Sequence, residues 1–157
     1  MTKKTYQFKI VIEICCLVLL LSADHISAAA TWKEVTSIGA TKYWWGITSS
    51  ADGTKLAAVV RYGNIWTSNN SGANWTEVTT TGAAKNWYGI TSSANGTKLA
   101  ATAHGGDIWT SSNSGATWTN TSVGYGASKK WNRITSSADG TKLVVNTEAH
   151  PSYENIM

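Results

Sequence analysis

Short apolar runs alternate with clusters of small polar residues along most of this 157-residue chain. Within one stretch, four runs rich in aromatic and β-branched side chains, at 44–49, 55–60, 64–68 and 74–79, are separated by turn signals that contain Gly, Asn and Asp. No stretch holds apolar residues at the i, i+3, i+4 and i+7 spacing of an amphipathic helix. The pattern therefore predicts an all-β protein of short antiparallel strands.

The same pattern recurs with a period of about 43 residues, which is typical of propeller blades and other repeat arrays. Sliding the chain by this period places Trp66 on Trp109, within two complete units at 44–78 and 87–121. A third, partial unit at 131–145 repeats only the first two strands. We therefore expect four antiparallel strands in each complete unit.

The repeats extend over residues 31–145, and the chain differs from the pattern at both ends. Residues 31–35 match 74–78, so the repeats begin with a last strand. Residues 146–157 form a divergent C-terminal tail that contains the chain's only proline.

The turns between the third and fourth strands resemble the Asp-box, or BNR, repeat. They read Ser-Asn-Asn-Ser-Gly-Ala-Asn-Trp at 68–75 and Ser-Ser-Asn-Ser-Gly-Ala-Thr-Trp at 111–118, with Asn where the family usually has Asp. In these turns, a side-chain oxygen can accept backbone N–H groups while a glycine adopts a left-handed conformation. We assign this structural role to Ser68, Asn70, Gly72, Trp75, Ser111, Asn113, Gly115 and Trp118.

The resemblance implies β-propeller-like blades of four antiparallel strands, with about two full blades and partial ones. The family includes sialidases, other glycan-cleaving propellers, sortilin-like receptors and photosystem II assembly factors. Its boxes are structural and lie on the face opposite the binding site, so they predict blades and not a substrate.

The predicted strand count leaves the propeller incomplete. One leading strand, two complete units and two trailing strands make about eleven strands, whereas closed propellers have about four to eight four-stranded blades. A fragment of a longer protein, a ring of several copies, and an open array that self-associates through its sheet edges all fit this count. The abrupt change after the third unit favours a fragment.

The first 30 residues have the pattern of a signal peptide. Lys3, Lys4 and Lys9 precede an apolar run at 14–21, and small residues at 27–30 provide a cleavage site. The run is shorter than the roughly 20 residues of a membrane-spanning helix. We therefore expect a secreted protein without stable membrane insertion, the alternative being a retained N-terminal anchor.

Cysteine and charge exclude several kinds of site. Cys15 and Cys16 both lie in the predicted signal, so the remaining chain has no disulfide and no Cys-based metal site. We predict no metal and no cofactor. The formal charge of +4 comes from scattered lysines and only two arginines. These cations are too few and too dispersed for a nucleic-acid interface.

The candidate binding residues recur at the entrance to each first strand and in the neighbouring turns. Aromatic faces beside cationic donors can stack on sugar rings while they hydrogen-bond hydroxyl or acidic groups. Indoles at a fixed offset, Trp44, Trp87 and Trp131, are instead expected to pack between units. The candidates are Lys42, Trp45, Arg61, Tyr62, Lys85, Tyr88, His104 and Arg133.

No catalytic constellation is present in the sequence. Two arginines cannot form the three-arginine cluster of a sialidase, and Asp52 and Asp139 occupy matching turns that turn chemistry explains. We therefore expect a non-catalytic recognition module for a glycan or an extracellular protein, with Asn-x-Ser/Thr sequons for glycosylation. The alternatives are a fragment of a glycan-cleaving propeller enzyme and a structural component of the extracellular matrix.

Overall fold

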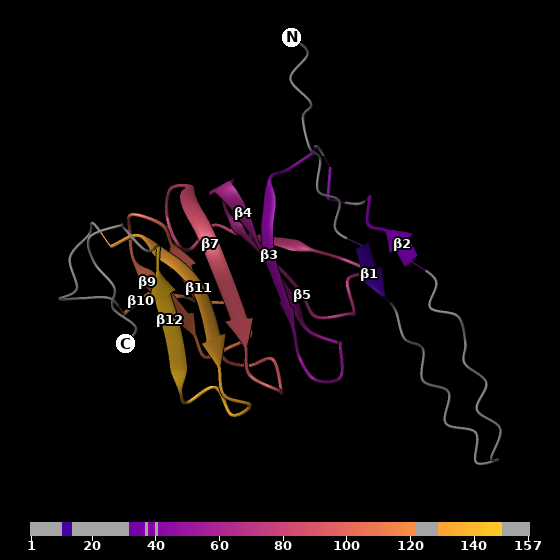
Figure 1. Cartoon of the computed structure of the whole chain (residues 1–157). Coiled ribbons are helices and arrows are strands. Elements are labelled where there is room, and N and C mark those ends of the chain that lie inside the picture. Colours follow the sequence, from indigo (N-terminus) through magenta and orange to yellow (C-terminus); the bar gives the residue numbers. More distant parts are fainter. Residues whose placement is uncertain (1–10, 14–31, 37, 40, 122–128, 149–157) are drawn as a thin grey trace, which may run out of the picture.

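The computed structural model describes residues 11–13, 32–36, 38–39, 41–121 and 129–148. Within these residues the protein is all-β and contains no helix, which confirms the predicted fold class (Figure 1). Most of the predicted signal peptide and residues 149–157 of the tail lie outside the described residues. β1 (Val11–Glu13) and β2 (Trp32–Glu34) are described and form an antiparallel pair.

The three units of the sequence repeat are three successive groups of antiparallel strands. Unit 1 consists of β3 (Trp44–Ser49), β4 (Leu56–Gly63), β5 (Ile65–Ser68) and β6 (Thr76–Val78). Unit 2 consists of β7 (Lys85–Ser92), β8 (Leu99–Ala103), β9 (Ile108–Ser111) and β10 (Thr119–Asn120). Unit 3 has β11 (Trp131–Ser136) and β12 (Leu143–Thr147).

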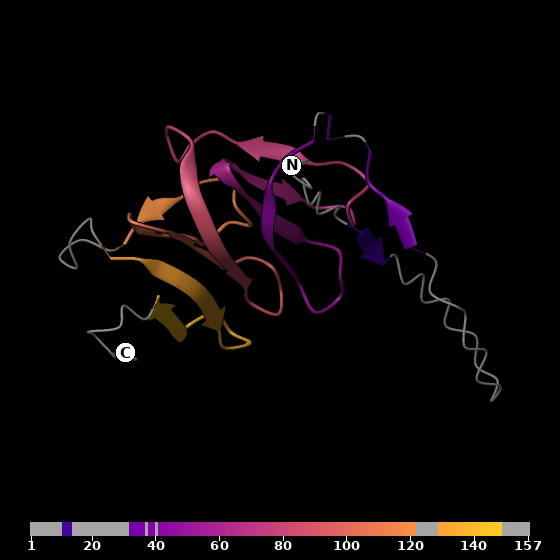
Figure 2. The ribbon, with the colours of Figure 1, turned by 45° about the horizontal axis from the view of Figure 1, so that its top comes forward.

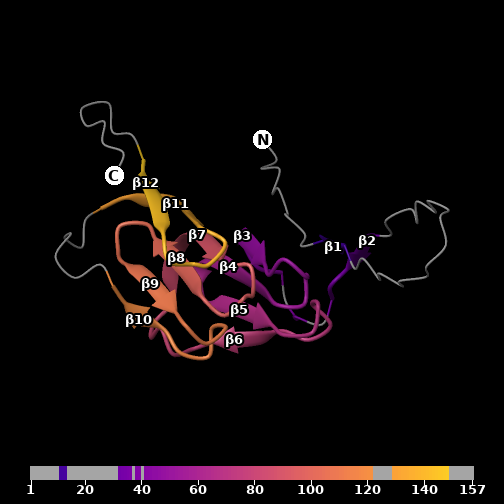
Figure 3. The same cartoon turned by 90° about the horizontal axis from the view of Figure 1, so that it is seen from below.

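The units lie side by side in chain order (Figure 2). Their first strands β3, β7 and β11 follow one side of the molecule, and β5, β6, β9 and β10 follow the other (Figure 3). The end of β4 also pairs with the start of β7, through Arg61 with Asn86 and Gly63 with Lys85. This short ladder joins units 1 and 2 into one curled sheet.

The hydrophobic core lies between units 1 and 2. On unit 1, Val59 pairs with Ile65 and Ile65 with Val78, so these side chains share the face that looks toward unit 2. Trp87 and Trp118 are among the unit 2 side chains of the same core cluster. Since large aromatic side chains contribute most to burial, the indoles of unit 2 largely hold the two sheets together.

The recurrent indole that begins each first strand packs between units wherever a preceding unit is present. Trp87 is fully buried and donates its Nε1–H to the carbonyl oxygen of Gly63 in unit 1, at 3.1 Å. Trp131 is also buried, whereas Trp44 in the first unit is only half-buried. This confirms the packing interpretation for Trp87, and the burial of Trp131 agrees with it.

The predicted Asp-box segments form two equivalent turns. In the first, Ser68 Oγ accepts the N–H of Gly72 at 2.9 Å, and Asn70 Oδ1 accepts the N–H of Asn74 at 2.9 Å. In the second, Gly115 donates to Ser111 at 3.0 Å and Thr117 donates to Asn113 at 2.9 Å. Gly72 and Gly115 have φ values of 83° and 86°, which explains why glycine recurs there. The Trp118 indole donates to the Gly115 carbonyl at 3.0 Å and closes its turn.

A glycine in the first strand determines how closely the next unit approaches. A Cβ added at Gly89 would lie 2.8 Å from the carbonyl oxygen of Asn132 and 2.8 Å from Thr102 Oγ1. At the matching Gly46 the nearest atom would be 3.3 Å away, on Val59. Unit 3 has Arg133 at this position.

We expect Gly89→Ala to destabilise the protein by about 1–3 kcal/mol, because the added methyl group overlaps the backbone of unit 3. Gly46→Ala is the matched control and should cost less, since it meets only a side-chain methyl group at a longer distance. Urea unfolding of both variants measures the difference. Equal losses would show that Gly89 does not set the spacing between units.

The turn between the first and second strands is also repeated. Asp52 and Asp139 each accept hydrogen bonds from the hydroxyl two residues before them and from the backbone N–H two residues after. Hydrogen bonds from Ser50 and Ser137, followed by those from Thr54 and Thr141, lower the pKa of the two carboxyl groups from 3.8 to about 2.

Because these pKa values are lower in the folded state, the two carboxylates stabilise the fold above the unfolded pKa, and this contribution is lost as the pH falls from 3.8 toward 2. We expect the double variant Asp52→Asn/Asp139→Asn to lose less of its Tm over this range than the wild-type protein. Asn95 occupies the same position in unit 2 and accepts from Ser93 and Thr97, so the amide fits. Thermal unfolding followed by circular dichroism tests this. Parallel pH profiles for the two proteins would contradict it.

Candidate functional site

Five of the predicted binding residues meet in one cluster, which we call the cationic–aromatic row: Trp45, Arg61, Tyr62, Tyr88 and His104. Arg61 is at its centre. Its guanidinium carbon lies 4.8 Å from the ring centroid of Trp45 and 5.1 Å from those of Tyr62 and Tyr88. At such distances the positive charge is attracted to the ring faces.

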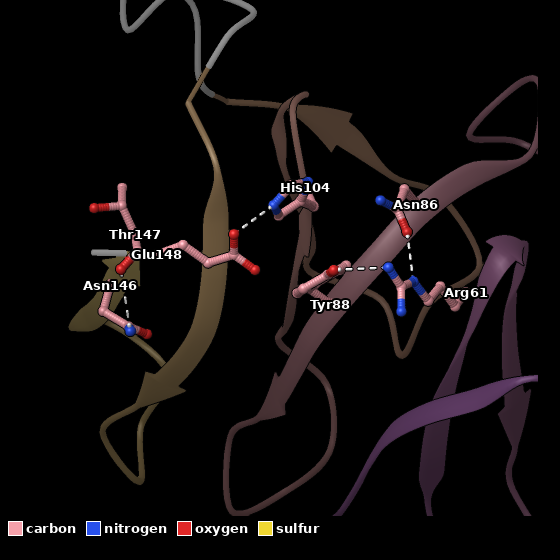
Figure 4. Close-up of polar contacts among 7 residues, drawn as sticks. All are labelled: Arg61, Asn86, Tyr88, His104, Asn146, Thr147 and Glu148. Atoms are coloured by element: carbon pink, nitrogen blue, oxygen red, sulfur yellow. Dashed lines mark hydrogen bonds and ion pairs between the residues drawn. The ribbon is translucent and has the colours of Figure 1, made fainter. Parts of the chain in front are cut away.

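Hydrogen bonds fix the orientation of the Arg61 side chain. Its Nε donates to Asn86 Oδ1 at 3.2 Å, and one terminal nitrogen donates to the Tyr88 hydroxyl at 3.0 Å (Figure 4). A guanidinium group has five N–H donors, so others remain for a ligand. Among the residues that the structure describes, no carboxylate forms an ion pair with Arg61.

The row continues across unit 2 to unit 3. Tyr88 lies between Trp45, with ring centroids 5.3 Å apart, and His104, which stacks on it at 4.5 Å. His104 Nε2 in turn lies 3.1 Å from Glu148 Oε2, a distance that gives an ion pair when the histidine is protonated (Figure 4). The row therefore holds an arginine among its aromatic rings and ends, at unit 3, in a histidine–carboxylate pair.

Two positions of the repeat build this surface. Trp45 and Tyr88 each occupy a register shift in the first strand, between Trp44 and Gly46 and between Trp87 and Gly89. A β-bulge adds one residue and redirects its side chain. Trp44 and Trp87, which precede the bulges, can therefore pack against the sheet. The bulged residues, Trp45 and Tyr88, belong to the cationic–aromatic row.

Arg61 and His104 of the row, and Glu148 beside it, share one position of the repeat at the end of the second strand. Arg61, His104 and Glu148 correspond to one another in units 1, 2 and 3. Each backbone N–H donates to the carbonyl of the residue that precedes the recurrent Trp: Arg61 to Tyr43 at 2.8 Å, His104 to Asn86 at 2.8 Å, and Glu148 to Lys130 at 2.9 Å. The backbone hydrogen bond is therefore repeated in all three units, while the side chain at this position changes from a guanidinium to an imidazole to a carboxylate group.

A groove runs beside the row toward unit 3. It has a volume of about 570 Å³ and is lined by Trp44, Trp45, Tyr88, Asn132, Arg133 and Glu148. Arg133 is exposed and lines the same groove as Trp45. A second groove of about 380 Å³ continues along the first strands over Ile47, Ile90 and Ile134.

Lys42 and Lys85, the other predicted residues, have a different environment. Lys42 Nζ lies 4.9 Å from the ring centroid of Trp66, and Lys85 Nζ lies 5.1 Å from that of Trp109. The two pairs repeat in units 1 and 2, which indicates that these lysines cover the indoles of the third strands. Their role in binding stays a prediction.

The sequence analysis did not identify Asn86 and Glu148, although both contact the row. Glu148 falls in the predicted divergent tail, three residues beyond the end of the third unit at 145. Its spacing of 44 residues from His104 is the signal in the sequence that it belongs to the repeat.

The described residues contain no group of three or more His, Cys, Asp or Glu side chains that could hold a metal ion. Over the same residues, no helix is both long and apolar enough to cross a membrane. Ring stacking and charged hydrogen bonding are contacts that the residues of the row can offer a ligand.

Neither a protein-family model nor a curated protein sequence matches this chain. Solved structures do match its fold, and they are β-propeller proteins. With two units of four strands and a third unit of two strands, the described part of the chain has the architecture of an incomplete β-propeller.

Three examples with TM-scores above 0.5 show how far the likeness extends. An ancestral enzyme of glycoside hydrolase family 74 matches 77% of this chain with a TM-score of 0.59 and 19% identity, and this chain covers 18% of it. A family 74 xyloglucanase from Xanthomonas campestris matches 74% with a TM-score of 0.55 and 14% identity, with 21% of its length covered. A structure of YCF48 bound to D1 peptide matches 68% with a TM-score of 0.54 and 8% identity, with 35% covered. The chain thus spans about a third or less of each, and such identities establish the fold alone.

Proposed function

We propose that this chain is a secreted, non-catalytic recognition module of the Asp-box type that binds a glycan or an extracellular protein through the cationic–aromatic row. One observation carries the proposal. Arg61 is held among three aromatic rings, with hydrogen-bond donors left over and no described carboxylate to neutralise it.

The exposed parts of the row suit a ligand that has both flat apolar faces and polar edges. Trp45 is 47% exposed and Tyr62 is 66% exposed, which is unusual for large aromatic side chains. A sugar ring can stack on such faces while its hydroxyl groups accept from the remaining donors of Arg61. A peptide with an aromatic or acidic side chain could use the same groups.

One feature supports recognition rather than catalysis, and the similar structures indicate the kind of ligand. Glu148 is the acidic member of the surface, and it is engaged with His104, whereas glycoside hydrolysis generally needs a pair of carboxyl groups. The similar structures include one described as bound to a peptide, which supports a protein partner, and two glycoside hydrolase family 74 proteins, which support a glycan.

A fragment of a glycan-cleaving propeller enzyme is the second candidate. It is favoured by the small share, 18% and 21%, of the two family 74 structures that this chain covers. In that case the missing blades would supply the catalytic carboxyl groups. Sequencing the transcript beyond the codon for Met157 distinguishes the two candidates, since further repeats with paired acids would favour the enzyme.

A glycan array and an extracellular-domain library, both probed with the full chain, test the recognition proposal. For a ligand found there, we expect Trp45→Ala and Tyr88→Ala to weaken binding at least tenfold, about 1.4 kcal/mol, because each removes a stacking face. Tyr43→Ala is the matched control, since Tyr43 is 67% exposed and lies outside the row. An absence of ligands in both screens, or equal affinities for all three variants, would refute the proposal.

A further inference from the structure

The third unit leaves one strand edge uncovered within the described residues. In units 1 and 2, the second strand pairs with a third strand, with Leu56 opposite Ser68 and Leu99 opposite Ser111. In unit 3, β12 pairs with β11, and the described residues provide no third strand. Leu143, the counterpart of Leu56 and Leu99, is accordingly 42% exposed, whereas those two are buried.

A groove lies beside this edge, and we call it the acceptor groove. Its volume is about 320 Å³. Unit 2 contributes Lys98 and residues of its third and fourth strands, and unit 3 contributes Leu143 at the start of β12. The residues used below are Lys98, Leu99, Thr110, Thr119 and Leu143.

The same surface of unit 1 is occupied, and its occupant is the β9–β10 hairpin of unit 2. At the tip of this hairpin, a Cβ on Gly115 would lie 2.7 Å from Thr67 Cγ2 of unit 1 and 3.3 Å from Leu99 Cδ1. Lys55 of unit 1 donates to Ser114 Oγ at 3.2 Å. A threonine, a lysine and a leucine therefore form the seat of the hairpin.

All three members of that seat have counterparts at the acceptor groove. Thr110 corresponds to Thr67 and Lys98 to Lys55, one repeat later. Leu143 corresponds to Leu99, the leucine that contacts the glycine. The groove thus repeats the side chains that already hold one hairpin in this molecule.

We propose that the acceptor groove binds a β-hairpin from a partner polypeptide that has the sequence pattern of residues 107–121. The first strand of the hairpin pairs with the free edge of β12, its glycine packs on Thr110, and its second Trp faces unit 2 as Trp118 faces unit 1. Main-chain hydrogen bonds to β12 supply affinity, and the requirement for glycine and tryptophan supplies specificity.

The test uses the full chain and a labelled synthetic peptide of residues 107–121, with binding followed by fluorescence anisotropy. We expect saturable binding that weakens at least tenfold for a Gly115→Val peptide, because no side chain fits against the threonine. A Trp118→Ala peptide should weaken to a similar extent. No binding by the wild-type chain, or equal binding of all three peptides, would overturn the proposal.

Two protein variants locate the site. Thr110→Lys places a long side chain in the groove and should weaken binding at least tenfold, whereas Thr80→Lys adds the same charge at an exposed position of the β6–β7 connection and should not. Trp45→Ala should also leave peptide binding unchanged, so this test is independent of the cationic–aromatic row. Equal binding by Thr110→Lys and Thr80→Lys would place the peptide elsewhere and refute the assignment.

Hydrogen exchange of the wild-type chain tests the strand addition directly, without any substitution. The amides of β12 at 143–147 that face its free edge should exchange at least tenfold more slowly when the peptide is bound. Unchanged exchange throughout β12 would exclude pairing with this edge.

Discussion

The face-to-face packing of one unit on the next is the interaction on which the structure depends. Each unit is a small sheet that cannot bury its apolar face alone, and the buried indoles of Trp87 and Trp118 fill the space between units 1 and 2. Gly89 then admits the backbone of unit 3 at a distance that no other residue allows. The stability of the fold therefore depends on the interface between each unit and the next. A unit without a neighbour must leave a face or an edge uncovered.

The same packing creates the candidate site. The register shift in each first strand separates two adjacent aromatic residues, so that Trp87 is buried between units while Tyr88 stacks with His104. Contacts in the row cross from unit to unit, from Arg61 to Tyr88 and from His104 to Glu148. The row is hence a consequence of stacking, and it depends on the spacing that the interior of the protein sets.

Local patterns made the strands, the repeat and the turns predictable from sequence, because alternation and turn chemistry act over a few residues. The Ser68–Asn70–Gly72 hydrogen bonds follow from the residue types alone. The site was only partly predictable. Lys42 and Lys85 stand beside the candidate aromatics in sequence, yet they cover Trp66 and Trp109, since the direction of a long side chain depends on the neighbouring strand.

Within the described residues, unit 3 leaves a face and a strand edge uncovered, and these two surfaces differ physically. On the face that a following unit would cover, Arg133 stands where Gly46 and Gly89 allow close approach, and Asn146 replaces Val59 and Thr102. A charged side chain at the closest point opposes a further unit in the same geometry, as the polar faces of capping repeats do. Self-association in which a second copy stacks on this face as the next unit would is therefore disfavoured.

The edge of β12 differs, because it keeps Leu143 and lies beside a groove that contains the threonine and lysine of a hairpin seat. The two surfaces of one unit therefore have opposite roles: the face resists another unit, and the edge can accept a strand.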